Sequence, residues 1–144
     1  MDTRFSSAIH ALILIAGSER PLTSEQIARS VGTNPSYIRK LTALLKRDGI
    51  IESRRGVGGF ALCVPAEELT LDRIYRAICE TDRVHVFDIH QNPSDGCAVD
   101  RHIRPVLTEA FQAMEEKAAQ VLKAQTLSDL MARMRRQIRG EEAS

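Results

Sequence analysis

The sequence predicts a mainly α-helical fold with a small β-wing, in which a winged helix-turn-helix is followed by a long dimerisation helix. Two observations lead to this prediction. Residues 22–63 contain two short helix patterns joined by a glycine turn, and then two strand-like runs joined by a glycine-rich link. A longer helix pattern ends near residue 125, and its apolar positions recur at alternating steps of three and four residues.

The composition agrees with one domain that carries an additional helix. The chain has 144 residues, of which 43% are hydrophobic and only 4% aromatic, so we expect a core of aliphatic side chains. A net charge of +1 does not exclude DNA binding, because a local basic face is sufficient to neutralise phosphates. We expect no membrane span and no signal peptide. The three widely spaced cysteines form no disulfide framework, and we therefore expect a cytoplasmic protein.

Helix starts are the clearest local signals in the first half of the chain. A first helix is expected over residues 6–16, before a glycine and a proline. Thr23 and Gln26 have the spacing of a capping box and predict a second helix. Asn34 and Pro35 suit the cap and first position of a third helix, which a glycine at position 49 ends.

The third helix is the expected recognition helix, because an α-helix fits the major groove and residues near its N-terminal end reach base edges. An ordinary surface helix with a solvated basic face is the alternative interpretation. The polar residues placed for base or phosphate contact are Asn34, Ser36, Tyr37, Arg39 and Lys40.

The two strand-like runs, residues 50–54 and 60–64, predict the wing. Arg54 and Arg55 precede the glycine-rich link, and Gly58 within it tolerates the backbone conformation of a tight turn. Such a turn brings arginines close to phosphates or the minor groove. A plain hairpin with solvated charges is the alternative. The link lacks the spacing of a nucleotide-binding glycine loop.

The second half of the chain predicts a loop and a dimerisation helix. Thr70 suits the cap of a fourth helix, and the stretch 92–96 is a strong loop signal. The long helix is expected to begin near residue 100 or 103, so that Pro105 falls in or near its first turn. Its narrow apolar seam suits packing against a second copy. The seam consists of Ile103, Leu107, Ala110, Met114 and Val121.

Several sequence blocks together resemble the Rrf2 family of bacterial transcription regulators. This resemblance implies a homodimeric winged-helix regulator with a long crossed dimerisation helix, which contacts DNA through Thr3 and Arg4, the third helix and the wing. We expect a repressor that binds a double-stranded DNA operator. We also expect a DNA-binding domain (1–80), a sensor loop (81–98), and a dimerisation helix with a C-terminal tail (99–144). The blocks, which cover roughly residues 3–130, are 5–16, 22–49, 54–62, 65, 69–71, 97–99 and 126–130.

The chain departs from the cluster-binding members of this family. Those members have three closely spaced cysteines in the loop before the long helix, whereas this chain has only Cys97 there. Ser7 stands where a nitric-oxide-sensing member supplies a carboxylate, and Cys63 and Cys79 are not spaced to complete a site. We therefore expect no iron–sulfur cluster and no other cofactor. The stretch from His90 to Cys97 resembles that of the cluster-free members with one loop cysteine.

Cys97 is the expected sensor residue, acting as a thiol at the start of the long helix. His85, His90 and His102 lie near it in sequence, but their spacing matches no compact metal motif and a metal site is not expected. Two alternatives stay open: a metal- or small-ligand-responsive regulator on the same scaffold, and a winged-helix interaction module without DNA binding. No nucleophile–base pair or cofactor loop is recognisable, so we expect no enzyme.

Overall fold

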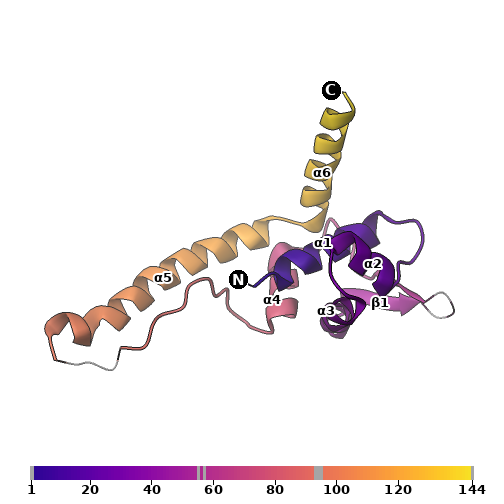
Figure 1. Cartoon of the computed structure of the whole chain (residues 1–144). Helices are drawn as coiled ribbons and strands as arrows, with labels where there is room; N and C mark the ends of the chain where they lie inside the picture. The colour runs from indigo at the N-terminus through magenta and orange to yellow at the C-terminus, as the bar shows by residue number, and fades with distance from the viewer. Residues whose placement is uncertain (1, 55, 57, 93–95, 144) are drawn as a thin grey trace.

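The computed structural model describes residues 2–54, 56, 58–92 and 96–143. Within these residues the chain forms six helices and one antiparallel two-stranded sheet, which confirms the predicted mainly α-helical class with a small β-wing (Figure 1). The elements are α1 (Arg4–Gly17), α2 (Ser24–Val31), α3 (Pro35–Arg47), β1 (Ile51–Arg54), β2 (Gly59–Leu62), α4 (Leu71–Cys79), α5 (Ala98–Ala124) and α6 (Leu127–Glu142).

The hydrophobic core lies between the first four helices and the wing. It is aliphatic, as the composition predicts, because helices with apolar residues at three- and four-residue steps bury them on one side. The first residue of α6 also belongs to it. The large side chains that are almost fully buried are Leu12, Ile27, Ile38, Leu41, Leu45, Ile50, Ile51, Leu69, Ile74, Ile78 and Leu127.

The predicted helix starts are confirmed by hydrogen bonds to their caps. The Thr23 hydroxyl accepts a bond from the Gln26 backbone N–H (3.2 Å), and the Gln26 side chain accepts one from the Thr23 N–H (2.9 Å). Asn34 accepts from the Tyr37 N–H at 2.8 Å. Thr70 caps α4 in the same way. These bonds satisfy N–H groups that have no partner inside the helix.

The wing is shorter than predicted, and the chain before α2 adds to it. β1 and β2 pair antiparallel, with Arg54 opposite Gly59. The Phe60 N–H donates to the Leu22 carbonyl at 3.0 Å, so Leu22 pairs with β2 by one bridge. Gly59 is required by this approach, because a Cβ there would lie 2.7 Å from the Pro21 backbone carbon.

α5 begins earlier than the sequence analysis expected. It starts at Ala98, so Pro105 is inside the helix and beyond its first turn, and the expectation for this proline is wrong. The missing N–H removes one hydrogen bond from the helix. Pro105 is exposed to solvent, and the other backbone hydrogen bonds of this 27-residue helix keep the helix continuous.

The junction of α5 and α6 is fixed to the start of α4. The Leu71 N–H donates to the Gln125 carbonyl (2.9 Å), and the Leu127 N–H donates to the Leu69 carbonyl (2.8 Å). Thr126 caps α6 with a capping box. From this junction the two helices extend in different directions (Figure 1). Among the described residues, no helix is long and apolar enough to cross a membrane.

Candidate nucleic-acid interface

α3 is buried along one side and polar along the other. Ile38, Leu41 and Leu45 are almost fully buried, and the buried Thr42 hydroxyl donates to the Ile38 carbonyl at 2.9 Å. This packing fixes the helix on the core. The predicted contact residues remain outside it: Tyr37 is half-buried, whereas Asn34, Ser36, Arg39 and Lys40 are exposed.

The exposed side of α3 is locally basic although the whole chain is almost neutral. The helix has Arg39, Lys40, Lys46 and Arg47 and no acidic residue. Arg39 lies 3.4 Å from the Glu25 carboxylate, a long and exposed contact that contributes little. Lys40 has no ion pair among the described residues. Arg39 and Lys40 can therefore turn to a phosphate or a base edge without losing a strong partner, whereas Arg47 pairs with Glu80 at 2.9 Å.

The wing places a second set of basic and glycine residues near α3. Arg54 is half-exposed and lies 3.5 Å from the Glu52 carboxylate. Gly58 is exposed with a φ of 69°, a conformation that favours glycine. The Lys46 ammonium donates to the Ser53 hydroxyl at 3.0 Å and joins α3 to β1, a contact that the sequence did not indicate. Arg55 is outside the described residues.

The N-terminal segment opens α1, a helix that contacts α3, but its arginine already has a partner. Arg4 and Asp2 form an exposed ion pair at 2.7 Å, with further bonds from the Arg4 Nε and backbone N–H. These hydrogen bonds lower the pKa of Asp2 to about 2. The hydrogen bonds and charge of Asp2 raise the pKa of Arg4. Thr3 is exposed beside it. Sequence reasoning missed Asp2.

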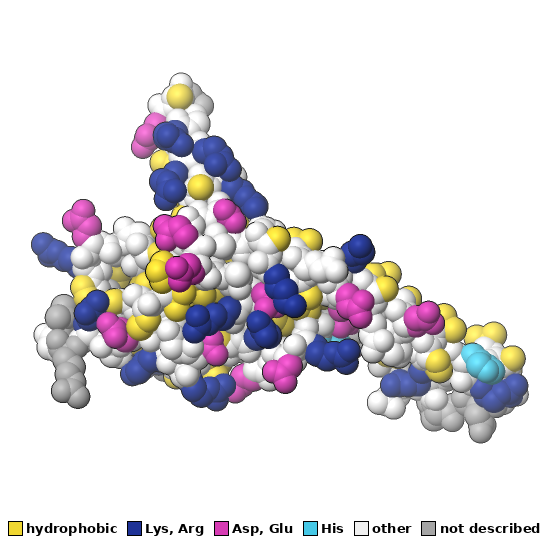
Figure 2. Space-filling view, turned by 180° about the vertical axis from the view of Figure 1, so that it is seen from behind, with side chains coloured by type: hydrophobic (Ala, Val, Ile, Leu, Met, Phe, Trp, Pro, Cys, Tyr) yellow, Lys and Arg dark blue, Asp and Glu magenta, His cyan; other side chains and the backbone are white. Residues whose placement is uncertain are grey.

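α5 exposes the predicted seam. None of its residues is buried in the single chain. Met114 is 52% exposed and Val121 54%, Ala110 is exposed, and Ile103 and Leu107 are half-buried. Figure 2 shows hydrophobic side chains along this helix, and basic side chains along α6. An apolar stripe of this kind is typical of an interface, and its partner remains a prediction.

Cys97 is exposed at the start of α5, where its Sγ accepts a bond from the Asp100 N–H at 3.4 Å. The predicted histidines do not gather around it. The His102 Nδ1 lies 2.7 Å from the Ala98 carbonyl oxygen. His85 instead pairs with Asp88 at 2.7 Å, and this bond raises the pKa of His85. In the part of the chain that the structure describes, no three possible metal ligands come together.

A helix-turn-helix with an exposed basic third helix and an adjacent wing defines a class, the winged-helix DNA-binding transcription regulators. Known proteins with similar sequences belong to the same class. Residues 1–133 match the model of the family described as Rrf2, iron-dependent transcriptional regulator. The chain belongs to the Rrf2 family, whose members are regulators and not enzymes.

Relatives cover nearly the whole chain. YwnA of Bacillus subtilis, named as a candidate HTH-type transcriptional regulator, is 35% identical over 131 residues, which span 91% of this chain and 96% of YwnA. A crystal structure described as that of a candidate DNA-binding protein is 34% identical, covers 89% of this chain and 98% of its own, and has a TM-score of 0.71. CymR of B. subtilis, at 21% identity and a TM-score of 0.68 over 92% of this chain and 95% of CymR, shares the fold.

The family description implies iron, but the described residues of this chain do not fit an iron–sulfur cluster. Such a cluster requires about four thiolate or imidazole ligands. Cys63 follows β2, Cys79 ends α4 and Cys97 precedes α5, so the three thiols belong to separate elements. Burial raises the pKa of the Cys79 thiol, and partial desolvation together with Glu52 raises that of the exposed Cys63, which disfavours the thiolate that a metal binds.

Proposed function

We propose that this protein is a cytoplasmic homodimeric repressor that binds a dyad-symmetric DNA operator and responds to thiol oxidation at Cys97. The observation that carries the proposal is the position of α3, which is packed on the core along one side and presents a basic, acid-free side next to the wing. A repressor of this kind acts sterically, because the bound dimer covers DNA that polymerase needs.

Binding to DNA is tested by selecting sequences from a random duplex library with the full chain. We expect enrichment of a site with two half-sites about one helical turn apart, roughly 34–36 Å. Replacing Arg39 and Lys40 with Ala should then weaken binding about tenfold or more. Arg47→Ala is the matched control, because Arg47 ends the same helix and pairs with Glu80 at 2.9 Å. A library without enrichment would contradict the proposal and favour an interaction module.

Dimerisation is supported by the exposed seam of α5. A helix of 27 residues without one buried side chain is unusual in a folded chain, and its apolar residues need a second surface. A symmetric pair of such helices would bury the seam of both copies and separate the two recognition helices by a fixed distance.

Redox response is supported by the position of Cys97, exposed and adjacent to the backbone N–H groups that begin α5. In the test, diamide joins Cys97 to glutathione in a mixed disulfide and takes up the two hydrogen atoms that the thiols lose. We expect the modified protein to bind its selected operator more weakly, and Cys97→Ser to be insensitive. Cys63→Ser is the control, since Cys63 is also exposed. Unchanged affinity of protein shown by mass spectrometry to be modified would refute redox sensing.

A further inference from the structure

A groove of about 670 Å³ runs between α4, the segment 81–89 and α5. The described part of the segment after α4 makes no backbone–backbone hydrogen bond over residues 82–92. Side chains hold it instead: the Arg104 guanidinium donates to the His90 carbonyl at 2.7 Å, and Asn92 donates to the Asp100 carbonyl at 2.6 Å. One wall of the groove can therefore move without breaking regular secondary structure.

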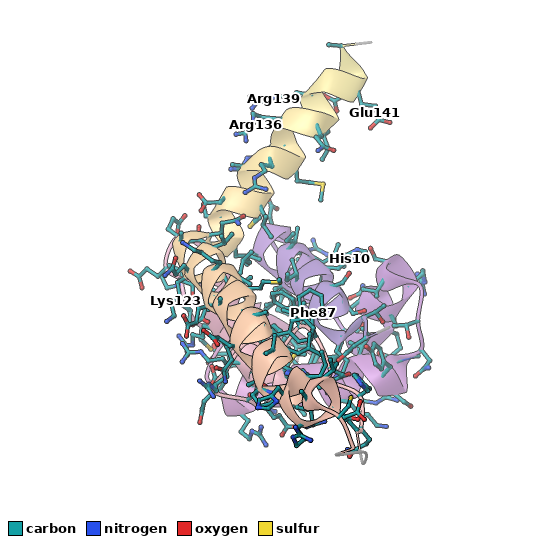
Figure 3. The ribbon with its side chains drawn as sticks, turned by 90° about the vertical axis from the view of Figure 1, so that its left-hand side faces the viewer. His10, Phe87, Lys123, Arg136, Arg139 and Glu141 are labelled. Carbon is teal, nitrogen blue, oxygen red and sulfur yellow. The ribbon has the colours of Figure 1, made fainter. Side chains whose placement is uncertain are left out.

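The middle of the groove is apolar. The rings of Phe87 and Phe111 lie 5.1 Å apart and tilted by 42°, and Val84 and Ile89 line the same groove. Phe87 is 43% exposed, which is high for a phenylalanine. Figure 3 shows Phe87 beside α5, on the side that faces the rest of the molecule. This surface suits the apolar part of a small ligand.

Arg76 supplies a site for a carboxylate. It lines the groove with its side chain 48% exposed, and its guanidinium donates to Asp72 at 2.5 Å. The Asp72 side chain is only 5% exposed, so the buried carboxylate fixes the orientation of the arginine. A guanidinium has five N–H donors in a planar fork, and those that Asp72 does not use can bind a ligand carboxylate.

Glu115 supplies the opposite charge. It lines the groove on α5, is half-buried, and has no hydrogen bond or ion pair among the described residues. Burial and, more weakly, Glu115 raise the pKa of Tyr75, the residue before Arg76, and Glu115 also adds to the rise in the pKa of His85 that Asp88 causes. A half-buried carboxylate that forms no ion pair among the described residues can bind a cationic group.

We propose that this groove binds an α-amino acid with a large apolar side chain. Its carboxylate pairs with Arg76, its ammonium group with Glu115, and its side chain packs on Phe87 and Phe111. At 3.6 residues per turn, the groove residues of α5 are centred about 130° around the helix from Met114, and Phe111 is the one nearest to the predicted seam.

Tyr75 connects the groove to the residues that are predicted to contact DNA. The Tyr75 hydroxyl donates to the His85 carbonyl and accepts from the His85 N–H, both at 3.0 Å. On its other side the Tyr75 ring packs edge-on against Phe5, with ring centres 5.3 Å apart. Phe5 follows Arg4 on α1. A ligand that moves the segment 81–89 therefore moves Tyr75 and the N-terminal segment; this consequence, unlike the binding site itself, rests on the proposed function.

Titration calorimetry on the full chain tests the site without DNA, with L-phenylalanine as the probe. We expect a dissociation constant on the order of 1 mM or below, and weaker binding of 3-phenylpropionate and phenethylamine, which lack the ammonium and the carboxylate respectively. Glu115→Gln should weaken L-phenylalanine about tenfold but leave 3-phenylpropionate unchanged, and Arg76→Lys should weaken both acids. Glu109→Gln, an exposed residue of α5 outside the groove, is the control.

Absence of L-phenylalanine binding at about 10 mM would overturn the proposal, and so would binding that Glu115→Gln and Phe111→Ala leave unchanged. A dimer whose partner fills the groove would give the first of these results. Operator affinity is measured separately with and without L-phenylalanine. A chain that binds the amino acid but no DNA would refute the proposed function and leave the groove site in place, and a chain that binds DNA but no amino acid would do the reverse.

Discussion

Replacing Met114 with Glu should weaken dimerisation by about two to three orders of magnitude. Met114 is 52% exposed in the single chain, so about half of its side chain remains to be buried by a partner. Full burial of a methionine contributes roughly 1.5–3 kcal/mol, and the missing half therefore contributes about 1 kcal/mol per copy, or about 2 kcal/mol per dimer.

The introduced charge adds to this loss. In a symmetric interface the new carboxylate at position 114 faces apolar side chains and its own symmetry mate, which together cost about 1–3 kcal/mol through desolvation and repulsion. The sum is about 3–5 kcal/mol. At 1.4 kcal/mol per tenfold, the dissociation constant of the dimer should rise about 100-fold to a few thousandfold.

Sedimentation velocity over a dilution series measures this constant. Gln120→Glu is the matched control, because Gln120 is exposed on the same helix but lies about 120° around it from Met114. The control should dimerise as the unmodified chain does. A Met114→Glu protein that dissociates at the same concentration as the control would refute the seam as the dimer interface. The interface would then have to use another surface.

Three further changes test the contacts around α3. Arg54→Ala should weaken binding to all DNA sequences and lower the salt slope by about one unit, measured by fluorescence anisotropy at several salt concentrations; an unchanged slope would remove Arg54 from the interface. Asp2→Asn should release Arg4 from its ion pair and raise DNA affinity about two- to fivefold. Because the pKa of Asp2 is about 2, the Asp2–Arg4 ion pair is intact above about pH 4. The gain in DNA affinity should therefore be equal at pH 6 and pH 8. Gly59→Ala should destabilise the fold by about 1–3 kcal/mol in urea unfolding, whereas Gly140→Ala, whose Cβ meets no atom within 4 Å, should not.

The elements that the sequence predicts well are those that local chemistry defines. Thr23, Asn34 and Thr70 have side-chain oxygens that can accept a bond from an N–H three residues later, and all three do so. The exposed residues of α3 follow from the same periodicity that buries Ile38 and Leu41. Both signals lie within one element, so no knowledge of the rest of the fold is needed.

Contacts between distant segments could not be read in this way. The bridge from Leu22 to Phe60 joins residues 38 positions apart, and nothing in either segment identifies the other. The early start of α5 has a local cause that was missed: Cys97 is a weak cap, and the proline at position 105 suggested a later start. The groove depends on three elements at once, and only Glu115 could have been noticed, as an acid four residues after Phe111 in the helix pattern.

Because the junction at Thr126 is fixed, a small rotation of α5 about this end moves its other end by several ångströms. A helix of 27 residues is about 40 Å long, so a rotation of 5° about its base displaces its far end by about 3.5 Å. That displacement is close to the roughly 3.4 Å rise of one base along a DNA strand. If two such helices cross in a dimer, a change in their crossing angle changes the separation of the two recognition helices. In that arrangement the stiffness of the joint between Leu69, Gln125 and Leu127 sets how sharply the dimer distinguishes operator spacings.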